Sequence, residues 1–261
     1  MSLKEFQKTT KEKEKFPESF EIKKKLYSPL SVLHYNLTFH FEDNYPAKMP
    51  KDFARDMILL YSNENDIVFD ACCGSGIVPR IANEMNRIGL GADINEKAIE
   101  LCKKLDPVFD FNYIVTDATR TIKTESKVDL ILSSLPFGLN IIGDKNNYSA
   151  NSNDISNCPN YESFFRQSQK IIQNYFEALK PNGVCILDAR DRLHNGKTIC
   201  LILEFLNQAQ KAGFELVTRF YYELIPYRQM TYKHKPTGNI KAMPASTDVI
   251  VLTKIEDEKL D

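Results

Sequence analysis

Short apolar runs alternate with longer segments of helical periodicity along most of this chain, and this alternation constrains its fold more than any other feature. Strands that are separated by helices pair mainly in parallel, and the helices then cover both faces of the sheet. The sequence therefore predicts an α/β fold with a Rossmann-like, seven-stranded, mostly parallel sheet. The expected strands are residues 67–70, 88–93, 113–116, 128–135, 184–187, 214–225 and 248–254.

Helix signals lie between these strands. Asn95 stands where it can cap a helix, and Gly213 stands where a helix can end. A long polar loop joins the last two strands, which we expect to form an antiparallel pair. The expected helices are residues 52–61, 77–87, 96–105, 161–179 and 198–211.

Composition limits the class of protein. The chain has 261 residues, 43% of them hydrophobic, which is enough for one substantial core. We expect a charged N-terminal extension (1–44), a main domain (45–255) and an acidic tail (256–261). No apolar run is long enough to span a bilayer or to resemble a signal peptide, so a cytoplasmic protein is expected. Cysteine and histidine show no metal-ligand spacing, and no metal is expected.

A glycine-containing loop follows the first strand. Residues 70–76 (DACCGSG) lie between a strand and a helix, where glycines let a ligand approach the backbone closely. Asp93 ends the next strand, near the offset at which an acid meets ribose hydroxyls. Asp70 disfavours a pyrophosphate, because a phosphate prefers a neutral or cationic neighbour. A cationic nucleoside such as S-adenosylmethionine suits the loop better, with Asp117 near its adenine amine.

The chemistry is expected where the strand 128–135 ends, at residues 133–137 (SSLPF). A small polar residue, a proline and an aromatic residue at the end of a strand can hold a flat ring and hydrogen-bond an amine on it. Ser134 can supply a side-chain acceptor, the Leu135 carbonyl a second one, and Phe137 a stacking face beside Pro136. Ser133 offers another hydroxyl, although strand alternation turns it to the opposite face.

Four segments, 45–50, 70–76, 91–95 and 134–137, resemble in order the motifs of class I methyltransferases that act on exocyclic amines of DNA bases. The resemblance implies the class I methyltransferase fold, S-adenosylmethionine as cofactor, and closure of residues around Tyr45 over its methionine end. The implied catalytic residues are Ser134, Leu135, Pro136 and Phe137. The implied cofactor-binding residues are Tyr45, Pro46, Lys48, Asp70, Ala71, Cys72, Gly74, Ser75, Gly76, Asp93, Ile94, Asp117, Ala118 and Ser134.

One position departs from the family pattern, in which a polar residue precedes two prolines and an aromatic residue. Leu135 stands at the first proline, where it keeps the carbonyl but restores an N–H donor and backbone flexibility. Methylation of adenine or cytosine in DNA is the expected function. Two alternatives stay open: an RNA base-amine methyltransferase, and a catalytically inactive subunit that binds nucleic acid.

A basic and aromatic segment lies between the last two expected strands. Its cations can neutralise phosphates and its tyrosines can stack on bases, although a solvated hairpin would have the same composition. No insertion is long enough for a separate recognition domain, so sequence recognition is expected from loops, the N-terminal arm, a protein partner or a homodimer. The expected nucleic-acid-binding residues are Tyr227, Arg228, Tyr232, Lys233, Lys235 and Lys241.

Overall fold

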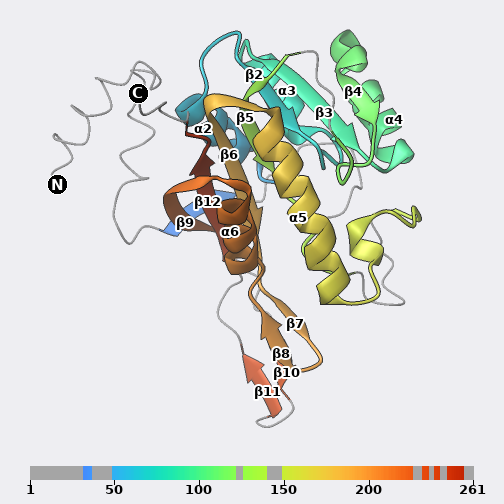
Figure 1. The fold of residues 1–261 in the computed structure, drawn as a ribbon, viewed down its shortest axis with the longest axis vertical. Coiled ribbons are helices and arrows are strands. Elements are labelled where there is room, and N and C mark those ends of the chain that lie inside the picture. Colours follow the sequence, from blue (N-terminus) through green and yellow to red (C-terminus); the bar gives the residue numbers. More distant parts are fainter. Residues whose placement is uncertain are drawn as a thin grey trace, which may run out of the picture.

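The structure is a computed structural model. It describes residues 32–36, 49–121, 126–139, 149–225, 231–234, 238–241 and 246–255. Its centre is an eight-stranded sheet in the order β1-β9-β12-β6-β5-β2-β3-β4 (Figure 1). The strands of this sheet are β1 (Val32–Asn36), β2 (Ile67–Asp70), β3 (Ile88–Asp93), β4 (Tyr113–Val115), β5 (Val128–Ser133), β6 (Leu179–Ala189), β9 (Glu215–Ile225) and β12 (Thr247–Thr253).

All seven expected strands are present, and the α/β prediction is confirmed. Strands β2, β3, β4, β5 and β6 are parallel neighbours, whereas β12 runs antiparallel to both β6 and β9. The additional strand, β1, pairs in parallel with β9, from Val32 opposite Tyr221 to Asn36 opposite Ile225. It lies within the segment that the sequence sets apart as an extension. The division at residue 45 itself stays a prediction.

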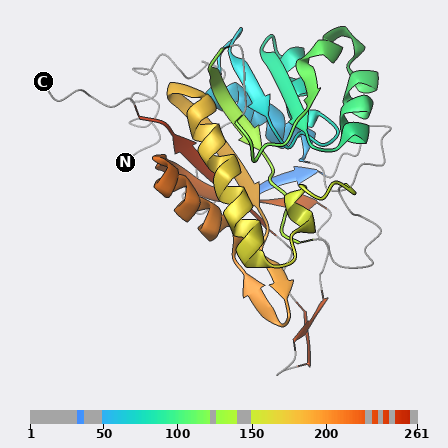
Figure 2. The same cartoon turned by 45° about the vertical axis from the view of Figure 1, so that its right-hand side comes forward.

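Helices cover both faces of the sheet (Figures 1 and 2). A hydrophobic core lies on each face of the sheet, because successive side chains along a strand point to opposite faces. On β5, Leu130 and Leu132 pack toward one layer, whereas Ile131 packs toward the other. The first layer contains α2 (Lys51–Tyr61) and α3 (Ile77–Glu84), the second contains α5 (Tyr161–Ala178) and α6 (Leu201–Ala212), and α4 (Glu96–Leu105) covers β3 and β4.

Local signals explain most helix ends. The Asn95 side chain accepts a hydrogen bond from the Lys97 backbone N–H at 3.1 Å and caps α4, and Gly213 ends α6 at a φ of 104°. Helix α6 begins at Leu201, three residues later than expected, because β8 (Lys197–Ile199) pairs with β7 (Arg192–His194) in a hairpin. A second hairpin, β10 (Thr231–His234) with β11 (Gly238–Lys241), lies near it (Figure 1).

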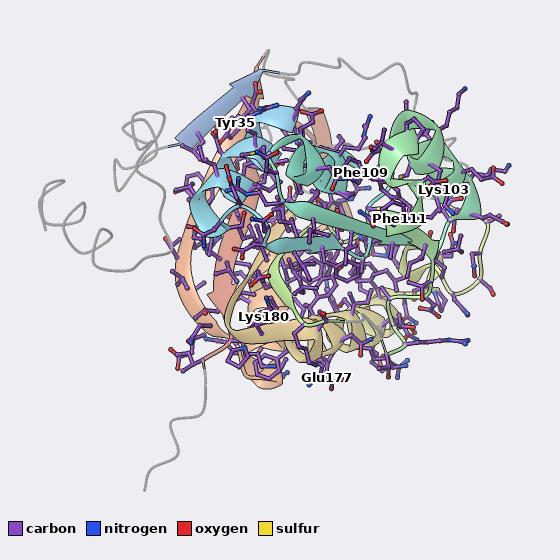
Figure 3. All side chains as sticks on the ribbon, turned by 90° about the horizontal axis from the view of Figure 1, so that it is seen from above. Tyr35, Lys103, Phe109, Phe111, Glu177 and Lys180 are labelled. Carbon is purple, nitrogen blue, oxygen red and sulfur yellow. The ribbon has the colours of Figure 1, made fainter. Side chains whose placement is uncertain are left out.

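The sheet has two distinct ends. Seen from above, Tyr35 on β1 marks one end, whereas Phe109 and Phe111, in the 3₁₀ helix η2 (Pro107–Asn112), mark the other (Figure 3). Within the described residues, no helix is long and apolar enough to span a membrane.

Candidate active site

Four acidic or hydroxyl side chains gather at the carboxyl edge of the sheet. Asp70 ends β2, Asp93 ends β3, Ser134 follows β5 and Asp188 lies near the end of β6. Because these strands are parallel neighbours, their carboxyl ends share one edge, where α/β proteins bind their ligands. Pairs of residues far apart in the sequence are thereby brought within hydrogen-bonding distance.

The loop after β2 is fixed by both acids. The Cys72 backbone N–H donates to Asp70 Oδ1 at 3.0 Å, and the Gly74 N–H donates to Asp93 Oδ2 at 2.8 Å. Asp93 Oδ1 accepts from the Asn95 N–H at 2.9 Å. At Gly76, with a φ of 76°, an added Cβ would lie 2.8 Å from a cysteine sulfur. Glycine is therefore required where the loop enters α3.

This loop is an anionic environment. Burial, with a smaller contribution from a neighbouring carboxylate, raises the pKa of Asp70 to about 7 and that of Asp93 to about 6. The buried Asp154 contributes to the shift at Asp93. Among the described residues, both hydrogen bonds to Asp70 end on Oδ1, so its Oδ2 is available to a ligand. A cationic ligand would stabilise both carboxylates.

Ser133 faces Asp70. Its hydroxyl donates to Asp70 Oδ1 at 2.7 Å and lies 2.8 Å from the Tyr175 hydroxyl, which is also 4.0 Å from Cys72 Sγ. Both Ser133 and Tyr175 are fully buried. Burial raises the pKa of Tyr175 well above its usual value, so the hydroxyl keeps its proton. Ser133 therefore belongs to the side of β5 that holds Asp70.

Ser134 faces a different acid. Its hydroxyl donates to Asp188 Oδ1, and the Tyr222 hydroxyl donates to Asp188 Oδ2 at 2.9 Å. Asp188 and Tyr222 are buried, whereas Ser134 is partly exposed. Burial raises the Asp188 pKa, an effect that the two hydroxyls and Arg190 oppose. Because the Ser134 proton is committed to Asp188, the lone pairs of Oγ remain available to accept hydrogen bonds from outside.

The residues after Ser134 differ in burial. The Leu135 side chain is 1% exposed and belongs to the core under α5, whereas Phe137 is partly exposed and packs against that core. Gly138 has a φ of 92°, and an added Cβ would lie 2.6 Å from the Tyr161 hydroxyl. Leu135 thus fills the core at the position where the family pattern has proline.

The third expected acid, Asp117, lies after β4 with local partners. Its Oδ1 accepts from the Thr119 N–H at 2.9 Å and the Thr119 hydroxyl at 2.6 Å, and its Oδ2 lies 3.4 Å from Arg120 Nε. These contacts shape the turn, and the adenine role stays a prediction. The remaining expected cofactor residues that the structure describes lie in the turns after β2, β3 and β4: Ala71, Cys72, Ser75, Ile94 and Ala118.

Several expected site residues are not placed beside this edge. Tyr45, Pro46, Lys48, Tyr227, Arg228 and Lys235 lie outside the described residues. Tyr232 and Lys233 lie on β10 and Lys241 on β11, so the backbone here is a hairpin. Their role toward nucleic acid stays a prediction.

Sequence reasoning missed three residues of the site: Asp188, Tyr175 and Tyr222. Asp188 carried a usable signal, because an acid near the end of a buried strand is the same pattern that identified Asp70 and Asp93. The two tyrosines carried none, since they lie on α5 and β9 and reach the site only through tertiary packing. In the part of the chain that the structure describes, no group of three or more His, Cys, Asp or Glu side chains is placed to hold a metal ion.

Comparison with known proteins identifies relatives of part of the chain. Residues 2–104 match the N6_N4_Mtase family model, described as DNA methylase. The chain is 36% identical over 87 residues to the type II methyltransferase M.HpaI of Haemophilus parainfluenzae, covering 32% of this chain and 28% of that protein. Over these residues the chain is similar to DNA methylases. This finding confirms the resemblance inferred from the motifs.

A second relative and a solved structure extend the comparison. The chain is 38% identical over 60 residues to the orphan methyltransferase M.BamHII of Bacillus amyloliquefaciens, covering 23% of each protein. The chain thus spans about a quarter of the length of these relatives. TrmN from Thermus thermophilus superposes with a TM-score of 0.55 and 18% identity, over 80% of this chain and 50% of that one. The class I methyltransferase fold is confirmed. The family match includes Asp70 and Asp93 but ends before Ser134.

Proposed function

We propose that this protein is an S-adenosylmethionine-dependent methyltransferase that modifies an exocyclic amine of adenine or cytosine in DNA. The observation that carries the proposal is Ser134, a partly exposed acceptor backed by Asp188 and located on the same sheet edge as Asp70 and Asp93. The relation to DNA methylases supports DNA as the substrate. A cytoplasmic location is proposed with it.

The residues around the glycine loop fit S-adenosylmethionine. When bound, this cofactor supplies an activated methyl group on a sulfonium. Asp70 Oδ2 would accept from its ammonium group, and Asp93 would bind the ribose hydroxyls. Both carboxylates would be stabilised as anions by the positive charge, which offsets the effect of their burial.

The amine would bind to Ser134. A hydroxyl whose proton is held by Asp188 can only accept at its remaining lone pairs, so it receives an amine N–H and draws the nitrogen lone pair out of conjugation. The Leu135 carbonyl would take the second N–H, and Phe137 would support the ring. The bond from nitrogen to the methyl carbon would form as the methyl–sulfur bond breaks and leaves a neutral thioether. The nitrogen would become positive, and Asp188 lies one hydrogen bond away to stabilise that charge and to receive the proton through Ser134.

Leu135 is compatible with activity in this arrangement. Its side chain is buried in the core, which fixes the backbone by packing rather than by a proline ring. The polar contacts of Ser134 are complete without a second proline. We therefore favour an active enzyme over an inactive binding subunit.

Recognition of a sequence is assigned to elements outside the chemical site. The hairpin formed by β10 and β11 is proposed to contact the nucleic acid, with loops, a second copy or another protein providing specificity. A base within a duplex must be flipped out to reach Ser134, at a cost of a few kcal/mol. Single-stranded substrates would avoid most of that cost.

The direct test is transfer of a labelled methyl group. Protein and labelled S-adenosylmethionine are incubated with duplex DNA, single-stranded DNA and RNA, and the nucleosides are analysed by mass. We expect N6-methyladenine or N4-methylcytosine from DNA. Label in RNA alone would establish the alternative substrate. Binding of nucleic acid without any cofactor binding by calorimetry would refute the enzyme.

A further inference from the structure

The structure contains two separate serine–aspartate pairs, each of which ends on a buried tyrosine. Tyr175 contacts the serine, Ser133, whereas Tyr222 donates directly to the acid, Asp188. Only the second pair includes the hydroxyl that faces the proposed amine site. What holds Asp188 in place is therefore decisive for how Ser134 is aimed.

We propose that Tyr222 is a positioning residue of the methyl transfer: its hydroxyl fixes the Asp188 carboxylate so that the other carboxylate oxygen orients Ser134. This inference rests on the proposed function and deepens it. The contact of Tyr222 with Asp188 Oδ2, at 2.9 Å, leaves Oδ1 for Ser134. Without the tyrosine hydroxyl, either carboxylate oxygen could turn toward Ser134, and the orientation of its lone pairs would no longer be defined.

The tyrosine ring is itself rigidly placed. Its centroid lies 4.5 Å from that of Phe53 on α2 and 5.7 Å from that of Tyr35 on β1, the latter in an edge-to-face arrangement at 83°. Tyr35 in turn donates to Asp56 Oδ2 at 2.9 Å. Removing only the hydroxyl of Tyr222 would leave this aromatic packing intact. The chemical and structural contributions of the residue can therefore be separated.

The groups around Asp188 make the pH dependence of kcat a second measurement for this inference. The groups that act on it are Ser134, Tyr222 and Arg190, and Asp188 itself raises the pKa of Asp70. The Tyr222 hydroxyl favours the carboxylate form, so its loss should raise the pKa of Asp188 further. If the carboxylate is the active form, the acid limb of the pH–kcat profile moves to higher pH.

The experiment compares Tyr222→Phe with Tyr221→Phe, a matched control on the adjacent, partly exposed tyrosine. We expect kcat of Tyr222→Phe to fall roughly 10- to 100-fold, as for the loss of a hydrogen bond to a charged group, with an unchanged cofactor Kd. The acid limb should shift upward in Tyr222→Phe alone. The control should match the parent protein in both measurements.

A double-mutant cycle with Ser134→Ala keeps the test decisive if stability also changes. Because Tyr222 acts through Ser134, its substitution should cost nothing further in the Ser134→Ala background, with kcat expressed per cofactor-binding site. Equal losses in both backgrounds, or a Tyr222→Phe protein with parental kcat and pH profile, would overturn the inference. A parent protein without methyl transfer would instead refute the proposed function.

Discussion

At the scale of the residue, the most consequential property of the site is its pair of buried carboxyl groups. Asp70 and Asp93 lie at adjacent strand ends with pKa values raised to about 7 and about 6. Their ordinary value is near 4, so the folded protein without ligand holds protons that the unfolded chain has released. A bound cation would reverse this preference. Cofactor binding and protonation of these acids are therefore linked.

This linkage predicts how the free energy of unfolding changes with pH. A raised pKa in the folded state stabilises the protein below about pH 4, and this contribution is lost as pH rises through about 6 to 7. We expect urea unfolding of the ligand-free protein to show lower stability at pH 7.5 than at pH 5, by up to about 1.4 kcal/mol per pH unit for each group. Asp93→Asn should flatten the slope. An equal slope in that variant would contradict the assignment.

The cofactor role of Asp93 has its own test. Asp93→Ala removes the acceptor of the Gly74 and Asn95 N–H groups and the proposed ribose contact. We expect cofactor affinity to fall at least about tenfold in calorimetry, whereas Ser134→Ala should bind the cofactor normally and lose turnover. Full turnover in Ser134→Ala would remove Ser134 from the chemistry.

Substitutions of Leu135 test whether its side chain acts through core packing. Leu135→Pro would restore the family pattern but empty a core position that is 1% exposed. We expect a loss of about 2 kcal/mol in urea unfolding and no gain in kcat. Leu135→Ile, which conserves volume, should cost less than about 1.5 kcal/mol. Higher activity in the proline variant would show that the leucine impairs the enzyme.

At the scale of the element, the close contact between α3 and β3 depends on one glycine. An added Cβ at Gly89 would lie 2.0 Å from the Pro79 backbone oxygen, which cannot move without shifting the helix. We expect Gly89→Ala to lower the free energy of unfolding by about 3 kcal/mol, measured in urea. Gly196→Ala, in open space at a φ of 76°, should cost only about 1 to 2 kcal/mol. Similar losses at both sites would contradict this packing.

Elements were predictable from the sequence to the extent that their signals are local. The strands that end in Asp70 and Asp93 were found because apolar runs, glycines and acids lie within a few residues of one another. The bond between Ser134 and Asp188 was not, because it joins neighbouring strands through a pairing that periodicity does not specify. The Asn- and Ser-rich composition of residues 140–160 predicts a mobile surface loop, but within its described part, 149–160, Ile155 is buried in the core.

At the scale of the whole molecule, the edge strand β1 is the least predictable part. It pairs with β9, from Val32 opposite Tyr221, across most of the chain length. Leu33 and Tyr35 are each 6% exposed, and Tyr35 packs on the ring that supports Asp188. Strand β1 is therefore joined to the candidate active site through one layer of aromatic side chains.

Truncation tests this connection. We expect removal of residues 1–36 to lower stability by on the order of 3 kcal/mol or more, because two buried side chains of β1 are lost. The matched control, removal of residues 1–31, keeps β1 and should unfold at a higher temperature than the longer deletion. Thermal unfolding of both proteins gives the comparison. Identical midpoints would show that β1 does not stabilise the domain.

The two serines at the end of β5 also bear on how such an enzyme can change over time. Since neighbouring strand residues face opposite sides, Ser133 serves Asp70 while Ser134 serves Asp188. A substitution at Ser134 can therefore change which amine accepts the methyl group. The side of the strand at Asp70, which is proposed to bind the methyl donor, is preserved. Insertion or deletion of one residue in β5 would turn the two serine side chains to the opposite faces of the sheet at the same time. This strand can therefore diverge by substitution, but its length is constrained.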